Sequence, residues 1–236
     1  MKPLADCKLY TFVDTAYLNG RAPELVAQQL CDGGSDLIQL RAKNSSPEEI
    51  RQMAEKILPI TKRANVGLAI NDYDDIAREL DADFCHLGQE DFFDAGYTNV
   101  SELRKGRDGS PGRPLGHGTS AGALGDRALP ELRIGLSTHS PEQAKRALAA
   151  GPDYIAIGPV FATGTKPGAK PVTLDYVRWA AAPQSGVTVP WFAIGGINLE
   201  NLGDVLAAGA KRVCVVSAIL TAPDVAKACA EFRRRL

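Results

Sequence analysis

Short apolar segments recur along the chain, each too continuously apolar for a strand with one face in water. Four of them follow one local pattern: the end of a helix, a small or glycine-rich turn, a polar residue and then the apolar run. This pattern occurs at 32–41, 79–89, 149–159 and 207–217. Strands without a polar face are typical of parallel sheets covered on both faces. The pattern therefore predicts buried parallel strands, each preceded by a helix.

Four further apolar segments lie before and between these units, at 8–13, 66–71, 132–137 and 191–196. They bring the predicted strand count to eight. Helical patterns fill most of the gaps between them. Eight alternating strand and helix units in 236 residues predict an α/β protein with one domain over 1–236, a (β/α)8 TIM barrel. A doubly wound sheet would usually have fewer strands and an early phosphate loop, and no GxGxxG or Walker motif follows the first strand.

Capping residues mark several helix boundaries. Left-handed glycines that end helices are expected at Gly33, Gly151 and Gly209. Two segments combine an N-cap serine, a proline at the first helical position and an acid or amide at the third: Ser46-Pro47-Glu48-Glu49 and Ser140-Pro141-Glu142-Gln143. Further caps are expected at Asn198 and Thr221.

One segment breaks the alternation. Residues 106–126 contain seven glycines, two prolines and almost no large apolar side chains, which predicts a long, mobile surface loop between the fourth and fifth strands. If residues 98–105 form the fourth helix, this loop lies at the bottom of the barrel, away from the chemistry, and we favour that arrangement. If they do not, the loop would overhang the site as a lid.

Composition narrows the class of protein. The chain is 44% hydrophobic with a formal charge of −1, which is ordinary for a globular domain. The only basic run, Arg233 to Arg235, is expected to be a solvated helix end, so no nucleic-acid partner is predicted. No apolar segment has signal-peptide or membrane-span length, so we expect a cytoplasmic protein without a membrane partner. The oligomeric state stays open, a homo-oligomer included.

Five scattered cysteines without a CxxC pair indicate neither a disulfide framework nor a zinc site. We expect them to be small buried apolar residues.

Polar side chains end the second predicted strand. Gln39, Arg41 and Lys43 alternate, so they share one orientation, inward and toward the barrel mouth. Barrel interiors normally take branched apolar side chains. Three polar residues in this register therefore indicate a ligand, with an internal salt-bridge layer as the alternative.

Two aspartates, Asp72 and Asp91, follow the third and fourth strands. Neighbouring strands lie about 4.8 Å apart, so the two carboxylates would repel each other unless a cation lay between them. Either one alone would serve as a helix N-cap. Beside Arg41 and Lys43, the pair indicates Mg²⁺ that is shared with a diphosphate.

A second anion site is predicted after the later strands. Groups suited to phosphate oxygens end strand five and follow strand six: Ser137, Thr163, Thr165 and Lys166. The second phosphate itself is expected after strands seven and eight, at Gly195, Gly196, Val216 and Ser217. The loops after strands seven and eight form the recurrent phosphate site of this fold. Two anions that face each other predict a transfer in which diphosphate leaves. We assign no role to His86, expected to be buried, or to His117, expected in solvent, and His139 stays open between site residue and loop packing.

The ordered motifs QLRAK, ND, HLGQED, GLSTHS, GPVFATGTK, AIGGI and VSAI resemble those of the thiamine-phosphate synthase family. Single motifs such as IGGI are common in barrels, but seven in this order are specific. The resemblance implies a transferase that joins 4-amino-2-methyl-5-(diphosphooxymethyl)pyrimidine to 4-methyl-5-(2-phosphooxyethyl)thiazole, giving thiamine phosphate and diphosphate. It implies Mg²⁺ as the cofactor and these two small molecules as the partners.

The resemblance also assigns roles residue by residue. Contacts to the pyrimidine diphosphate are implied for Gln39, Arg41, Lys43, Asn71, Ser137 and Lys166. Contacts to the thiazole phosphate are implied for Thr163, Thr165, Gly195, Val216 and Ser217. Mg²⁺ ligation is implied for Asp72 and Asp91, and a catalytic role for Arg41, Lys43, Ser137 and Lys166. The implied mechanism is dissociative: diphosphate leaves a pyrimidine methyl cation, which the thiazole nitrogen captures, so no nucleophile or strong base is needed.

Two alternatives remain beside this family. Thiazole tautomerases share the barrel and its phosphate loops, but typically lack the aspartates and use a histidine placed like His139; the presence of Asp72 and of Gln89-Glu90-Asp91 favours the synthase. A non-catalytic descendant would have lost some of the charged residues, and none is missing. The segment 106–126 is longer than the usual connection, which leaves its placement open.

Overall fold

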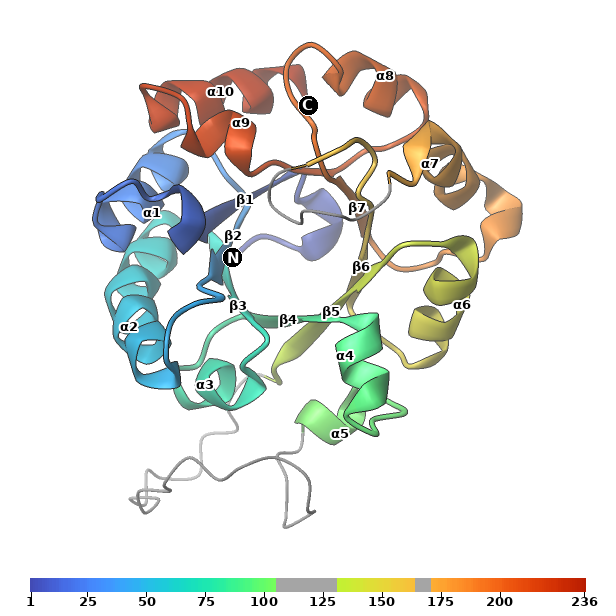
Figure 1. The fold of residues 1–236 in the computed structure, drawn as a ribbon, viewed down its shortest axis with the longest axis horizontal. Coiled ribbons are helices and arrows are strands. Elements are labelled where there is room, and N and C mark those ends of the chain that lie inside the picture. The colour runs from blue at the N-terminus through green and yellow to red at the C-terminus, as the bar shows by residue number, and fades with distance from the viewer. Residues whose placement is uncertain (105–130, 164–170) are drawn as a thin grey trace.

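Eight parallel strands close into a barrel surrounded by helices in the computed structural model (Figure 1). The structure describes residues 1–104, 131–163 and 171–236. Neighbours in the barrel follow the order of the chain, and β8 pairs with β1 to close the ring. The predicted (β/α)8 fold is therefore confirmed.

Every predicted apolar segment contains or overlaps a strand. The strands are β1 (Leu9–Asp14), β2 (Leu37–Arg41), β3 (Gly67–Asn71), β4 (Phe84–Gly88), β5 (Arg133–Thr138), β6 (Tyr154–Ile157), β7 (Trp191–Ile194) and β8 (Val213–Cys214). Most of their residues are buried, as expected for strands with helices on one face and the barrel interior on the other.

Helices fill the connections that the structure describes. They are α1 (Pro23–Asp32), α2 (Pro47–Ala64), α3 (Asp74–Glu79), α4 (Gln89–Asp94), α5 (Ser101–Arg104), α6 (Pro141–Ala149), α7 (Thr173–Ala181), α8 (Leu202–Ala207), α9 (Ser217–Leu220) and α10 (Val225–Arg235), with short 3-10 turns η1 (Leu4–Asp6), η2 (Thr15–Tyr17) and η3 (Pro183–Ser185). The two predicted serine caps are confirmed: the Ser46 hydroxyl accepts from the Glu49 N–H, and that of Ser140 from the Gln143 N–H.

Some predicted helix boundaries are wrong. Gly151 and Gly209 adopt the expected left-handed backbone, but Gly33 does not; its neighbour Gly34 does, with φ +84°. Gly33 is small for another reason, since a Cβ there would lie 2.5 Å from the Cβ of Cys229, where α1 packs on α10.

Two more predicted caps need correction. Thr221 ends α9 instead of beginning the last helix, and Asp224 caps α10, because the short helix α9 intervenes after β8. The Asn198 carboxamide accepts from the N–H groups of Glu200 and Asn201, so it closes the turn before α8 and is not that helix's N-cap.

The predicted fourth helix, at 98–105, is shorter than expected. Within the described residues only Ser101–Arg104 are helical there, because the Glu102 carboxylate takes the N–H groups of Thr98 and Asn99. A separate helix, α4, precedes it directly after β4. The predicted loop at 106–126 lies outside the described residues.

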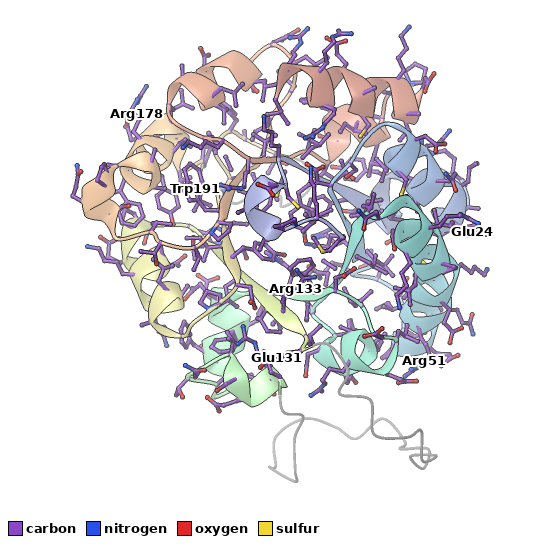
Figure 2. All side chains as sticks on the ribbon, turned by 180° about the vertical axis from the view of Figure 1, so that it is seen from behind. Glu24, Arg51, Glu131, Arg133, Arg178 and Trp191 are labelled. Atoms are coloured by element: carbon purple, nitrogen blue, oxygen red, sulfur yellow. The ribbon has the colours of Figure 1, made fainter. Side chains whose placement is uncertain are left out.

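An aspartate precedes three of the even-numbered strands at the end of the barrel where the strands begin. Asp36, Asp83 and Asp153 each accept an N–H from the strand before, donated by Leu9, Leu68 and Ile134 respectively. Each also pairs with an arginine: Arg233, Arg133 and Arg104. Figure 2 views this end, with Arg133 and Trp191, the first residues of β5 and β7, labelled. These contacts explain the polar residue in three of the four segments that share the repeated sequence pattern.

The cysteines are mostly buried, as the sequence predicts. All five cysteines are free and all are buried except Cys31, which is half-buried. None of the helices in the described ranges combines the length and apolar character needed to cross a membrane.

Candidate active site

A cavity lies at the end of the barrel where the strands finish, and all eight strands or the loops after them contribute to its wall. The described residues with a predicted site role all line it: Gln39, Arg41, Lys43, Asn71, Asp72, Asp91, Ser137, Thr163, Gly195, Val216 and Ser217. Thr165 and Lys166 lie outside the described residues. The structure thus brings the predicted residues together around one space, while their individual roles stay predictions.

Gln39 and Arg41 of β2 line this cavity, as the alternation predicts, and Lys43 lines it from the turn after the strand. Arg41 Nη1 donates to Asp14 Oδ2 over 2.9 Å, and Asp14 is only 1% exposed. The two residues face each other across β1 and β2. Sequence reasoning missed Asp14, although an aspartate that ends the strand beside Arg41 was a usable signal. Arg41 therefore has the internal salt bridge that was considered as an alternative, and it also faces the cavity.

Asp72 presents a carboxylate held by two donors. Its Oδ2 accepts from Lys43 Nζ and from Asn71 Nδ2, both over 2.6 Å. The alternative of a helix cap is wrong for this residue, because α3 has Tyr73 as its N-cap with no side-chain capping bond. Asp72 also has a left-handed backbone, φ +67°, which Asp and Asn tolerate better than most residues.

Asp91 comes from a helix and not from a loop. β4 ends at Gly88 and α4 begins at Gln89, so Asp91 lies in the first helical turn. A Cβ on Gly88 would lie 2.6 Å from Asp91 Oδ2, so this glycine makes room for the carboxylate. Asp91 and Asp72 line the same cavity from the segments that follow the neighbouring strands β4 and β3.

The donor set suits a metal that is shared with a substrate. Among the described residues no three His, Cys, Asp or Glu side chains cluster as a metal cage. Mg²⁺ usually keeps several waters and binds one or two carboxylates together with substrate phosphates. Two carboxylates beside Arg41 and Lys43 therefore fit Mg²⁺ on a diphosphate better than a metal held by protein alone.

The glycines after β7 have a packing reason of their own. Gly195 and Gly196 have φ +104° and +64°. The N–H groups of Val160 and Phe161 donate to the carbonyls of Ile194 and Gly195, which draws the loop after β6 against the end of β7. A Cβ on Gly195 would lie 2.3 Å from the Cβ of Pro159. Close backbone packing thus explains these glycines, and a phosphate contact there stays a prediction.

Two histidines line the cavity. His86 is buried as predicted, its Nδ1 lies 2.9 Å from the Tyr154 hydroxyl, and burial lowers the pKa of its imidazole to about 4. His139, for which the sequence leaves open a site role or loop packing, lines the cavity, and its Nδ1 bonds the Gly158 carbonyl oxygen of the neighbouring loop.

Comparison with known proteins decides the family. Residues 9–103 and 119–219 match the family model described as thiamine monophosphate synthase. The chain is 41% identical over 234 residues to a thiamine-phosphate synthase of Acidothermus cellulolyticus, covering 99% of this chain and 96% of that relative. The chain belongs to the thiamine monophosphate synthase family. A thiamine-phosphate synthase of Thermus thermophilus is also 41% identical, over 86% of this chain and 84% of its own length.

A solved structure agrees with this membership. A thiamine phosphate pyrophosphorylase from Pyrococcus furiosus superposes with a TM-score of 0.75 at 27% identity, covering 98% of this chain and 96% of that one. As a member of the thiamine monophosphate synthase family, the chain is an enzyme, a transferase of thiamine biosynthesis that acts on small molecules.

Proposed function

We propose that this enzyme joins 4-amino-2-methyl-5-(diphosphooxymethyl)pyrimidine to 4-methyl-5-(2-phosphooxyethyl)thiazole, giving thiamine phosphate and diphosphate by a dissociative, Mg²⁺-assisted route. The observation that carries the proposal is the division of the cavity wall. The cations Arg41 and Lys43 and the carboxylates of Asp72 and Asp91 lie at or after β2 to β4, whereas Thr163, Gly195, Gly196, Val216 and Ser217 follow β6 to β8. In a closed ring of eight sequential strands, β3 lies opposite β7. A diphosphate and a monophosphate would then face each other across the barrel mouth.

Each side chain has a task in this transfer. Arg41, oriented by Asp14, and Lys43 neutralise the oxygens of the departing diphosphate. The Ser137 hydroxyl, from β5, donates to the same group. Asp72 and Asp91 would hold Mg²⁺, which supplies further charge stabilisation to the leaving group. By motif, Lys166 assists on the diphosphate side.

The remaining wall suits the acceptor and the intermediate. Thr163, Val216 and Ser217 hold the thiazole phosphate, together with Gly195 and, by motif, Thr165. The apolar side chains of Phe12, Ile194 and Ile197 also line the cavity. Such a wall limits the water that would otherwise capture a pyrimidine methyl cation before the thiazole nitrogen does.

The test is diphosphate release from the two substrates, measured with and without Mg²⁺ for the wild type, Asp72→Asn and Asp91→Asn. Asparagine is the better replacement at position 72, because it tolerates φ +67° where alanine would add backbone strain. Loss of either carboxylate should slow turnover about 100-fold, equivalent to ~3 kcal/mol of transition-state stabilisation. Higher Mg²⁺ concentrations should recover part of the loss.

Asp175→Asn on α7 is the matched control. Its side chain is 85% exposed and pairs with Arg178 outside the cavity, so this variant should keep wild-type turnover. Product formation that ignored Mg²⁺ and tolerated both site changes would contradict the metal assignment. A folded wild type that released no diphosphate from this pair of substrates would contradict the proposed function itself.

A further inference from the structure

A continuous hydrogen-bonded chain of four buried polar groups borders the cavity, and the mechanism above uses none of them beyond the substrate contact that the resemblance implies for Gln39. Gln39 Nε2 donates to the Tyr10 hydroxyl over 2.7 Å. The hydroxyls of Tyr10 and Tyr154 lie 3.0 Å apart, and the Tyr154 hydroxyl lies 2.9 Å from His86 Nδ1. Both tyrosines are 0% exposed, whereas Gln39 and His86, the two ends of the chain, line the cavity.

The number of protons on each group indicates in which direction the hydrogen bonds of this network are donated. The Tyr10 hydroxyl accepts from the Gln39 amide, and we assign its own proton to the Tyr154 oxygen, an acceptor 3.0 Å away. The Tyr154 hydroxyl, having accepted that bond, donates its own proton to His86 Nδ1. Burial raises the pKa of both tyrosines, so each hydroxyl keeps the one proton that it has to donate. A neutral imidazole that accepts at Nδ1 carries its proton on Nε2.

We propose that Tyr10 and Tyr154 are positioning residues that fix the polarity of this part of the cavity wall. Through them, Gln39 presents its Oε1 as an acceptor and His86 presents its Nε2–H as a donor. Because both residues line the cavity, these are the ends that a ligand meets. An acceptor and a donor together suit a ring that carries an amino group beside a ring nitrogen. The aminopyrimidine of the proposed function has this pattern, and only this last step rests on that function.

The packing around the two tyrosines holds their hydroxyls in place. Tyr154 pairs in register with Gly135 of β5, where a Cβ would lie 2.1 Å from the Tyr154 Cζ, so glycine alone admits the ring. The Phe192 ring packs edge-on against both tyrosine rings, with centroids 5.4 Å from Tyr10 and 5.7 Å from Tyr154. Polar groups held this firmly in a buried network cannot turn to other partners without disturbing the core.

The first test reads the histidine tautomer by NMR of the ¹⁵N-histidine-labelled full chain, without substrate. The protein has only three histidines, and His86→Asn identifies the imidazole signal of His86. The wild type should show His86 protonated on Nε2. Tyr154→Phe removes the donor to Nδ1 and should shift the Nδ1 resonance or mix the tautomers. Tyr10→Phe should leave the tautomer unchanged, because Tyr154 still donates to His86.

The second test uses steady-state kinetics. The variant expected to leave the tautomer unchanged in the first test, Tyr10→Phe, is the one expected to change the kinetics here. Tyr10→Phe leaves the Gln39 amide without its acceptor, so the KM for the pyrimidine diphosphate should rise about three- to tenfold, the effect of one lost hydrogen bond. The KM for the thiazole phosphate should not change. Tyr176→Phe is the control for loss of a buried tyrosine hydroxyl, since that group bonds Thr138 and not the chain described here. It should leave the His86 signal unchanged.

Specific outcomes overturn the proposal. They are a wild-type His86 protonated on Nδ1, a Tyr154→Phe spectrum identical to the wild type, or a Tyr10→Phe variant in which both KM values rise together. If one variant does not fold, the wild-type spectrum and the other variant still test the proposal. The tautomer is measured without substrate, so it does not depend on the proposed reaction. A failure of the proposed function can therefore be distinguished from a failure of the positioning role of the two tyrosines.

Discussion

Arg41 shows how one side chain can serve the fold and the ligand together. Its guanidinium is anchored on the buried Asp14 and still forms part of the cavity wall. An arginine has many rotamers, and a fixed carboxylate selects the one that faces the substrate. We therefore regard Asp14 as the residue that orients the principal cation of the site.

Asp14→Asn tests this role. The amide keeps the shape of the carboxylate and can still accept from the Ala16 N–H, but the charged partner of Arg41 is lost. We expect kcat/KM for the pyrimidine diphosphate to fall about tenfold, the loss of one charge-assisted hydrogen bond, while the KM for the thiazole phosphate stays the same. Steady-state kinetics with Asp175→Asn as the control measures both. Unchanged kcat/KM would mean that the diphosphate orients Arg41 by itself.

At the residue scale, the sequence could predict side chains whose direction follows from strand alternation. Gln39 and Arg41 are inward because β2 is buried and its period is two, whereas Lys43 lines the same cavity from the turn after the strand. It could not predict Tyr10 and Tyr154 as a hydrogen-bonded pair. A tyrosine in an apolar strand is usually a core residue, and these two come from strands that lie 144 positions apart.

Helix α2 carries the strongest local signal in the chain, a complete capping box. The Ser46 hydroxyl accepts from the Glu49 N–H, and the Glu49 carboxylate accepts from the Ser46 N–H. Ser46→Ala should lower the free energy of unfolding by about 1 kcal/mol. Urea denaturation measures this, with the neighbouring Ser45→Ala as the control because Ser45 has no capping position. Equal stability of the two variants would contradict a capping role.

The same box predicts a pH dependence. The backbone N–H of Ser46 lowers the pKa of Glu49 in the folded protein. A carboxylate with a lowered folded-state pKa stabilises the fold above its unfolded-state pKa, and this stabilisation disappears as the pH falls through the folded-state value. Glu49→Gln should therefore be less stable than the wild type near neutral pH, with the difference shrinking in acid. A difference that stayed constant with pH would argue against the charged contact.

At the element scale, boundaries set by local contacts were predictable and those set by tertiary packing were not. The caps at Ser46 and Ser140 involve residues three positions away, so the sequence contains both partners. The short helix α9 and the early start of α4 depend on how the chain leaves β8 and β4, which no local pattern encodes. For this reason the sequence predicts Thr221 as a helix N-cap, whereas the residue that caps α10 is Asp224.

At the scale of the whole molecule, the two ends of the barrel have different roles: one end carries the cavity, and the other carries contacts that stabilise the fold. The cavity lies where the strands finish. The aspartates that bond neighbouring strands lie where the strands begin. The strand count and alternation were enough to predict the closed barrel, because few other folds accommodate eight buried parallel strands. The ion pairs at the lower end were not predictable, since their partners are distant in sequence.

Asp36 connects several separate segments at that lower end. Its carboxylate accepts from the N–H groups of Lys8 and Leu9 and pairs with Lys2 and Arg233, so it joins the N-terminal segment and α10 to the barrel. Asp36 is only 7% exposed. Removing one partner from such a network leaves the opposite charges without compensation, which costs about 3 kcal/mol.

Asp36→Asn should therefore lower the free energy of unfolding by about 3 kcal/mol, which corresponds to a fall in Tm of roughly 6–12 °C for a chain of this size. Turnover measured at 25 °C, where the variant is still folded, should match the wild type, because the substitution lies at the end opposite the cavity. Asp32→Asn, an exposed change on α1 that removes a charge but leaves an oxygen to accept from Gln28 Nε2, is the control. A folded Asp36→Asn variant with reduced turnover would show that the lower ion pairs also set the geometry of the site, and the division between the two ends would not hold.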